Sequence, residues 1–233
     1  MKLEICSNSY QSAINAEKAG ADRIELCSEL SVGGITPSYG LLKKVSEEIN
    51  IPVNVLIRPR SGNFCYTDDE FETIKNDIKT CKDFNFNGIV SGVLNADNSI
   101  DVKRTQELIE LSKPLSFTFH RAFDCVANPE KALEIIMDLK VDRILTSGLR
   151  EKAEQGIDLL MKLQKIAKDQ LIILPGSGIN SKNAHLFKEA GFKEIHTSAS
   201  KEITKSNVFF DTTKQTVSDI KTIQGILKVI KNA

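Results

Sequence analysis

Two cysteines near the start of the chain, Cys6 and Cys27, each end a short run of β-forming residues. If the two runs are neighbouring strands, about 4.8 Å apart, both thiolates could bind one metal ion, and soft thiolates favour Cu(I). The alternative is that both are small apolar core residues, as free cysteines often are. Oxidation would instead join them in a disulfide. Cys65, Cys81 and Cys125 fall in loop or helix patterns without a partner cysteine, so we expect them to be structural.

Ionisable side chains gather at the ends of the other predicted strands. Glu25 and His120 offer general acid–base chemistry, and Arg58 with Arg60 could hold an anion in bidentate fashion. Glu25, His120 and Arg58 are therefore the candidate catalytic residues, and His196 joins Arg60 as a candidate ligand-binding residue. Glu4 could add a second carboxylate to this group. The alternative is an internal ion-pair network that only satisfies buried charges.

A third group follows the last predicted strands. Gly176, Ser177 and Gly178 form a short glycine-rich turn, and Ser198 follows the final strand. Backbone N–H groups in such loops often bind phosphate in parallel barrels, although the same turns also serve as plain connections. Further candidate ligand-binding residues lie after the fifth and sixth strands, namely Arg121, Asp124 and Ser147.

Eight β-rich runs alternate with helical patterns along the chain, which predicts parallel strands joined by helices. The predicted strands are Leu3–Cys6, Arg23–Cys27, Val53–Arg58, Gly88–Ser91, Leu115–His120, Arg143–Thr146, Leu171–Leu174 and Glu194–His196. The clearest predicted helices are Ser9–Ala19, Thr67–Phe84, Glu151–Lys168 and a last one near Val217–Lys231. Eight such units predict one α/β domain, a (β/α)₈ TIM barrel over residues 1–233.

An internal repeat in the even-numbered strands supports the barrel and predicts which side chains face inward. Residues 19–28, 139–148 and 190–199 align with one another, and residues 86–92 form a looser copy. The repeat puts isoleucine in one column, which we assign to the outer, helix-packed face. Side chains alternate along a strand, so Glu25, Cys27, His196, Glu4 and Cys6 should point inward. Such a lining is unusually polar for a barrel interior.

The composition excludes several other classes of protein. The 233 residues are close to the roughly 250 typical of one such barrel. Lys plus Arg and Asp plus Glu are balanced at 31 each, so the chain lacks the basic surplus of a general nucleic-acid-binding protein. No run is apolar enough for a signal peptide or a membrane span. We therefore expect a cytoplasmic protein with reduced cysteines and neither nucleic-acid nor membrane partners.

At the predicted strand ends the sequence resembles the CutC family of copper homeostasis proteins. The resemblance is carried, in register, by residues 23–28, 33–38, 57–62, 118–124 and 142–148. It extends from Leu3 to about Ser200, with Ser177 in place of an expected glycine, and is weakest over residues 201–233. It implies a cytosolic, self-associating TIM barrel linked to copper, in which the cysteines proposed as copper ligands match Cys6 and Cys27.

Three functions follow from these patterns. The first is a copper homeostasis protein that holds Cu(I) through Cys6 and Cys27, most simply as a homodimer. The second is a metal-independent enzyme acting on a small phosphate- or carboxylate-bearing metabolite through the ionisable groups at the strand ends. The third is a non-catalytic interaction protein, in which those groups are structural.

Overall fold

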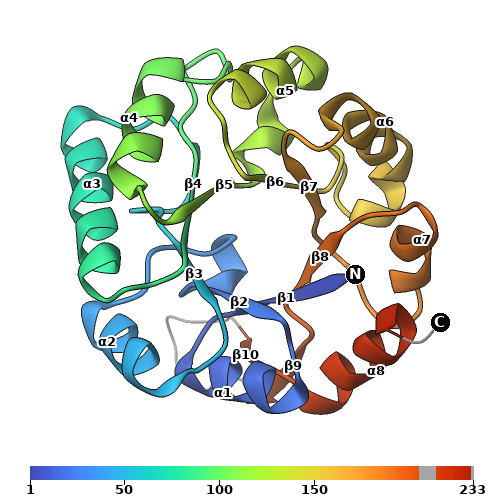
Figure 1. Ribbon diagram of the computed structural model, residues 1–233. Helices are drawn as coiled ribbons and strands as arrows, with labels where there is room; N and C mark the ends of the chain where they lie inside the picture. The colour runs from blue at the N-terminus through green and yellow to red at the C-terminus, as the bar shows by residue number, and fades with distance from the viewer. Residues whose placement is uncertain (205–213, 232–233) are drawn as a thin grey trace.

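Eight parallel strands form the centre of the computed structural model, which describes residues 1–204 and 214–231. Their order is β7-β6-β5-β4-β3-β2-β1-β8, and a parallel bridge between Gly176 and His196 joins the two ends of the sheet. The predicted (β/α)₈ barrel is therefore confirmed (Figure 1). The strands are β1 Lys2–Ser7, β2 Arg23–Leu26, β3 Val53–Leu56, β4 Gly88–Ser91, β5 Ser116–Phe119, β6 Arg143–Thr146, β7 Ile172–Pro175 and β8 Glu194–Thr197.

Helices surround the strands on the outside of the barrel (Figure 1). Polar side chains cap several of them: Ser9 accepts a hydrogen bond from the Ser12 N–H group before α1, and Thr67 and Glu70 form a reciprocal capping box before α3. The helices are α1 Tyr10–Ala19, α2 Tyr39–Glu48, α3 Asp68–Asp83, α4 Val102–Ser112, α5 Pro129–Asp138, α6 Ile157–Ala167, α7 Ala184–Glu189 and α8 Ile220–Lys231, with 3₁₀ turns η1 Leu30–Val32, η2 Arg121–Cys125 and η3 Ala153–Gly156.

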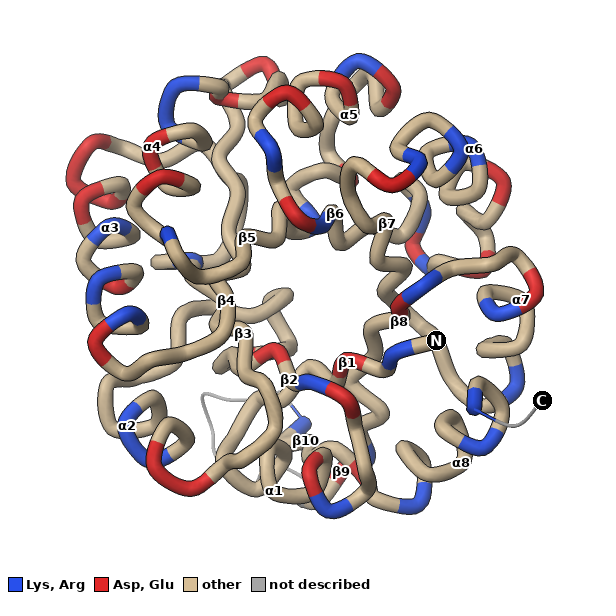
Figure 2. The backbone as a smooth tube through the Cα atoms, viewed as in Figure 1, with Lys and Arg blue, Asp and Glu red and all other residues tan. Residues whose placement is uncertain are grey.

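The predicted strand facing is also found in the structure. Ile24, Ile89, Ile144 and Ile195 are fully buried in the apolar layer that includes the inner faces of the helices, where each contributes about 1.5–3 kcal/mol by leaving water. The neighbouring positions bring charged residues to the barrel interior, and Figure 2 shows acidic and basic residues on β1, β2 and β8 as well as on the helices.

The C-terminal region differs from its prediction. An antiparallel hairpin, β9 Ser200–Thr204 and β10 Gln215–Ser218, stands between β8 and the last helix. Val217 pairs with Lys201 in this hairpin, so helix α8 begins at Ile220 and not near Val217. The predicted helix over Glu151–Lys168 is also shorter, because η3 precedes α6.

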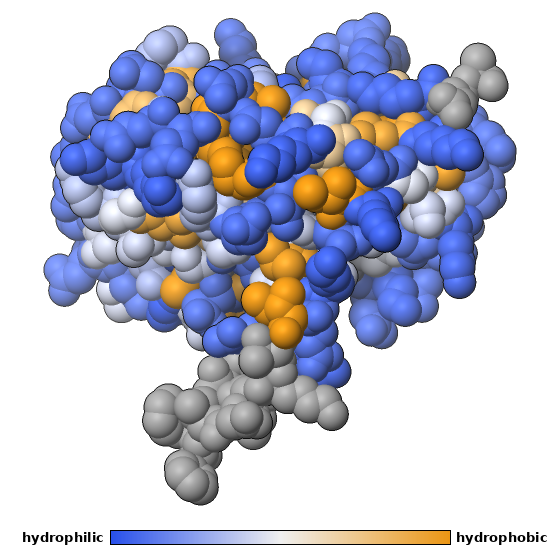
Figure 3. Space-filling model, turned by 90° about the horizontal axis from the view of Figure 1, so that it is seen from below, coloured by the Kyte–Doolittle hydropathy of each residue, from blue (hydrophilic) through white to orange (hydrophobic). Residues whose placement is uncertain are grey.

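The surface offers few large exposed apolar side chains. Figure 3 shows one side of the molecule, on which hydrophobic groups are interspersed among hydrophilic ones. The exposed large apolar residues come from separate segments of the described chain: Val32, Tyr39, Val102, Met161 and Ile203. Within residues 1–204 and 214–231, no helix has the length and apolar character needed to cross a membrane. The predicted homodimer stays a prediction.

Candidate functional site

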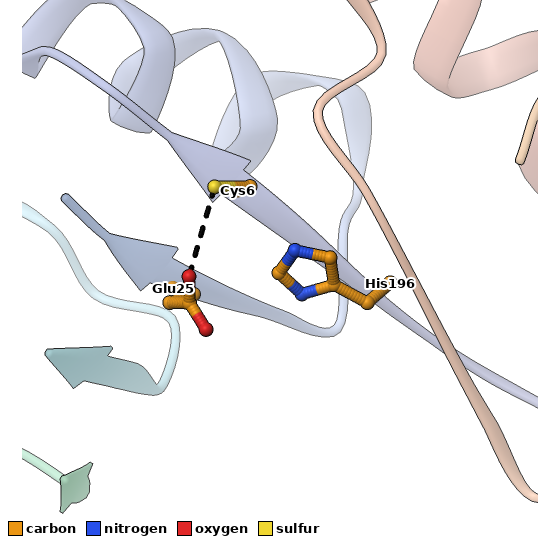
Figure 4. A group of neighbouring side chains, drawn as sticks. All are labelled: Cys6, Glu25 and His196. Carbon is orange, nitrogen blue, oxygen red and sulfur yellow. Dashed lines mark hydrogen bonds between the residues drawn. The ribbon is translucent and has the colours of Figure 1, made fainter. Parts of the chain in front are cut away.

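Three potential metal ligands meet where strands β8, β1 and β2 lie side by side. Cys6 is opposite Glu25 in the β1–β2 register, and His196 of β8 is opposite Glu4 of β1. The ligand atoms of Cys6, Glu25 and His196 lie within 4.8 Å of one another, and all three residues are buried. In Figure 4 the His196 ring points toward the other two side chains, and the Cys6 thiol donates to Glu25 Oε1 across 3.7 Å.

Cys27, which directly follows β2, completes a pair of thiols. Its Sγ atom lies 3.6 Å from that of Cys6, so the structure brings the two predicted cysteines together. Metal–thiolate bonds are about 2.3 Å long for zinc, so two sulfurs at this separation are within reach of one ion of that kind. The group formed by Cys6, Cys27, Glu25 and His196 is called the thiol site below.

The loop between β2 and α2 covers Cys27. Gly34 has φ +86°, and a Cβ atom there would lie 2.6 Å from Leu56 Cδ2 and 3.4 Å from Cys27 Cβ. Glycine is needed here for two reasons: it adopts the left-handed backbone conformation readily, and it lets the loop pack closely against Leu56 and Cys27. Cys27 is fully buried, whereas Cys6 lines the cavity at the C-terminal end of the barrel. A ligand in that cavity meets Cys6 first.

Arg58 holds this loop in place. Its guanidinium donates to the carbonyl oxygens of Val32, Gly34 and Gly62 at 2.9, 3.0 and 2.7 Å. The same group lies over the ring of Phe64, with 4.8 Å between the guanidinium carbon and the ring centroid. Arg58 Nε has no hydrogen-bond partner although the residue is buried. Arg58 therefore positions a loop, and one N–H group is left for another partner.

Below the thiol site lies a layer of buried ion pairs. Arg23 pairs with Glu4 and with Glu194, the latter at 2.6 Å, and Arg143 also reaches Glu194 at 2.9 Å. Burial alone would raise the pKa of Glu4, but Arg23 and His196 lower it to about 2. Glu4, Arg23, Arg143 and Glu194 are called the ion-pair layer below.

The ion-pair layer contains residues that the sequence reasoning did not single out. Arg23, Arg143 and Glu194 each begin an even-numbered strand, one position before the outward-facing isoleucine of the repeat. Their shared position in the repeat is a signal by which they could have been found. These residues form an internal ion-pair network, which was the alternative interpretation of the buried charges. The network lies below the thiol site and does not include Cys6, Cys27 or Glu25.

The pKa values of three groups in the thiol site are shifted from their ordinary values. Burial raises the pKa of Glu25 to about 7, although His196 counteracts part of this rise. The hydrogen bond to Cys27, burial and the nearby Glu25 carboxylate raise the pKa of Cys6 well above its ordinary value. Burial would lower the pKa of His196, but Glu25, Cys6 and Glu4 raise it well above 6.5. His196 donates through Nδ1 to Glu4 Oε1 at 2.8 Å.

His120 lies on another part of the cavity wall, just after β5. Its Nδ1 atom accepts a hydrogen bond from the Ala122 N–H group at 3.2 Å, and its buried Nε2 atom has no partner. Burial, together with the charge of Arg58, lowers the pKa of His120 to about 3. The ring is therefore neutral at physiological pH and packs 4.8 Å from the Phe64 ring, centroid to centroid.

A cavity of about 660 Å³ opens at the C-terminal end of the barrel, a size typical of small-molecule sites. Besides Cys6, Glu25, Arg58, His120 and His196, it is lined by the predicted residues Arg121, Asp124, Gly178 and Ser198. Apolar side chains complete it, among them Leu30, Leu56, Phe64 and Leu145, which sequence reasoning missed.

Besides Cys27, three predicted residues do not line the cavity. Arg60 pairs with Glu70 at the start of α3, and Gly176 packs against Leu145 and His196. Ser147 hydrogen-bonds Asp124, whose carboxylate also accepts from Arg121 Nε at 2.7 Å. The Asp124 carboxylate is therefore occupied in joining the loops after β5 and β6.

The remaining cysteines have no disulfide partner. Cys65 is half-buried and Cys81 is buried in α3, whereas Cys125 is exposed and lines the cavity.

Comparisons with known proteins give a consistent result. Residues 1–201 match the model of the CutC family. A family protein named CutC from Klebsiella pneumoniae is 47% identical over 197 residues, which are 84% of this chain and 79% of the relative. Another from Yersinia enterocolitica is 48% identical over 203 residues, covering 87% and 80%.

Solved structures agree. A CutC protein from Streptococcus agalactiae, whose name proposes a role in copper homeostasis, has a TM-score of 0.80 and 32% identity, covering 85% of this chain and 98% of its own. The thiamine phosphate pyrophosphorylase from Pyrococcus furiosus, at 14% identity, has a TM-score of 0.63 and covers 99% of this chain and 95% of its own. The second likeness concerns the fold alone.

Proposed function

The chain belongs to the CutC family, and from this premise we propose that it binds Cu(I) at the thiol site, with Cys6 and Cys27 as the principal ligands. The observation that carries the proposal is the separation of 3.6 Å between two buried sulfur atoms, one of which belongs to Cys6 in the wall of an accessible cavity. Soft sulfur ligands in an apolar setting favour Cu(I) over harder divalent ions.

Glu25 and His196 support the two thiols in this proposal. Thiols bind metals as thiolates, so binding must release protons. Cys6 already donates its proton to Glu25 Oε1, and a carboxyl with a pKa of about 7 can accept that proton near neutral pH. Once His196 is deprotonated, its ring nitrogen can serve as a third ligand from β8, harder than the two thiolates.

Without an ion, the thiol site favours protonated sulfur. The pKa of Cys6 is raised well above its ordinary value by Cys27, by burial and by Glu25, which makes the thiol a poor nucleophile at neutral pH. A cation would reverse this balance, because its charge stabilises the thiolate. The burial and proton affinity of the pair therefore suit reversible binding of a thiophilic ion more than nucleophilic catalysis.

The test is a Cu(I) titration of the reduced protein in competition with a chromogenic Cu(I) chelator. We expect one ion per chain, and a loss of at least about 100-fold in affinity for Cys6→Ser and Cys27→Ser, since each removes one of two principal ligands. Cys125→Ser is the matched control, because this thiol also lines the cavity but lies outside the thiol site. Wild-type affinity in both Cys6→Ser and Cys27→Ser would disprove the proposal.

A further inference from the structure

A second part of the cavity wall, formed by His120, Arg58 and Phe64, has two buried N–H groups without a partner. These are His120 Nε2 and Arg58 Nε, in residues that are only 4% and 5% exposed. A buried donor that is left unsatisfied costs about 1–3 kcal/mol. Both residues line the cavity, but the two nitrogen atoms themselves are buried, so a ligand there satisfies them only where the Phe64 ring, which packs against both residues, moves aside. These three residues are called the His120 wall below.

The hydrogen bonding of His120 fixes what its free nitrogen can do. Because Nδ1 accepts from the Ala122 backbone, the proton of the neutral ring must be on Nε2. Burial and the neighbouring Arg58 charge keep the ring neutral, with a pKa of about 3. His120 is therefore a fixed N–H donor within the cavity wall, and it is poorly suited to accept a proton.

The remaining groups at the His120 wall favour an electron-rich, planar or anionic ligand. The Phe64 ring packs against both residues, with its centroid 4.8 Å from the Arg58 guanidinium carbon and 4.8 Å from the centroid of the His120 ring. Arg121 adds a second guanidinium at the rim. The Asp124 carboxylate, which also lines the cavity, is already hydrogen-bonded by Arg121, Thr146 and Ser147, so it does not compete strongly for the two donors.

We propose that the His120 wall is a binding site for the oxyanion group, carboxylate or phosphate, of a small metabolite, with His120 Nε2–H and Arg58 Nε–H as its donors. Both nitrogens carry a hydrogen and no free lone pair, so they can only donate, and the oxygens of a carboxylate or phosphate are suitable acceptors. The cavity, at about 660 Å³, has room for such a molecule beside the thiol site.

This inference does not depend on the copper proposal. The sequence suggested that His120 moves protons in a metal-independent enzyme, whereas its hydrogen bonds assign it a positioning and binding role. Glu25 and the two thiols belong to the thiol site, on β1 and β2, and the His120 wall is built from residues that follow β3 and β5. The two sites can therefore be tested separately with variants of the same chain.

The experiment is a titration of ¹⁵N-labelled protein with two probes, inorganic phosphate and pyruvate, followed by the imidazole ¹⁵N resonances. We expect His120 to show the Nε2–H tautomer, and one of the probes at millimolar concentration to shift its Nε2 signal. His120→Phe should lower the affinity for that probe about tenfold, because the substitution removes one hydrogen bond to a charged group. His120→Gln, which keeps an N–H donor near the Nε2 position, should restore part of the affinity.

His185→Gln is the matched control, because this histidine is exposed on α7 and should leave binding unchanged. The double variant Cys6→Ser/Cys27→Ser should lose Cu(I) but keep the probe, which separates failure of this inference from failure of the copper proposal. The response of the wild type identifies which oxyanion is preferred. A His120 signal that neither probe shifts, or an Nδ1–H tautomer, would overturn the inference without the need for any variant to fold.

Discussion

The ion-pair layer and the cavity above it are built from the same kinds of residue but differ in how their polar atoms are satisfied. In the ion-pair layer, Arg23 and Arg143 face two carboxylates at hydrogen-bond distance. In the cavity, Glu25 Oε2, Arg58 Nε and His120 Nε2 are buried without a partner. Buried polar groups are normally hydrogen-bonded, and these three unsatisfied atoms belong to residues that line the cavity.

The comparison also concerns proton affinity. Glu4 and Glu25 are adjacent buried carboxylates, but Arg23 helps to lower the pKa of Glu4 to about 2, and burial raises that of Glu25 to about 7. The difference arises from the partners and not from the residue type. It separates a carboxylate that stabilises the fold from one that can exchange a proton near neutral pH.

The largest effect should come from breaking the ion-pair layer. Arg23→Met leaves Glu4 and Glu194 without their shared partner in a buried setting, and we expect a loss of about 3–5 kcal/mol in the free energy of unfolding, measured with urea. The control is Lys162→Met, which breaks an exposed pair with Glu130 and should cost at most about 1 kcal/mol. Equal losses in the two variants would contradict the distinction between the regions.

Glu25→Gln should raise the free energy of unfolding, in contrast to Arg23→Met. The folded-state pKa of Glu25, about 7, exceeds its ordinary value of 4.5. The stability that protonation contributes is present below pH 4.5 and is lost as pH rises through 7, by about 3 kcal/mol in total. We expect the glutamine variant to gain stability relative to wild type over this interval, followed by urea unfolding at several pH values. A constant difference between the two proteins would mean that Glu25 ionises normally.

A smaller effect is expected where the loop covers Cys27. Gly34→Ala puts a Cβ atom 2.6 Å from Leu56 at a left-handed φ, which should cost about 1–3 kcal/mol. The same variant should make Cys27 react faster with an alkylating reagent, as followed by mass spectrometry. Gly40→Ala is the control, because its Cβ atom would meet open space on helix α2 and should stabilise the protein by up to about 1 kcal/mol. Unchanged Cys27 reactivity in Gly34→Ala would argue against the loop as its cover.

The smallest effect should follow from Arg60→Met. Arg60 pairs with Glu70 at the partly exposed start of α3, so its loss should cost at most about 1 kcal/mol. Neither Cu(I) affinity nor the response of His120 to phosphate or pyruvate should change, because Arg60 does not line the cavity. A weakened ligand response in this variant would show that the anion site extends beyond the His120 wall.

Local patterns were sufficient for the fold and for much of the site. The alternation of strand and helix patterns predicted the eight-stranded barrel, and the repeated isoleucine column predicted which side chains face inward. This works because side-chain direction in a strand depends on position alone. The same alternation brought Cys6, Glu25 and His196 to one end of adjacent strands, where they meet.

Only the tertiary structure decided which polar atoms are paired. Arg58 and Arg60 are two residues apart and looked equivalent in the sequence, yet one lines the cavity and the other pairs with Glu70 on α3. The β9–β10 hairpin and the loop over Cys27 likewise depend on contacts between distant segments. Hydrogen bonding and desolvation are properties of the assembled surroundings, which a residue's type and spacing do not specify.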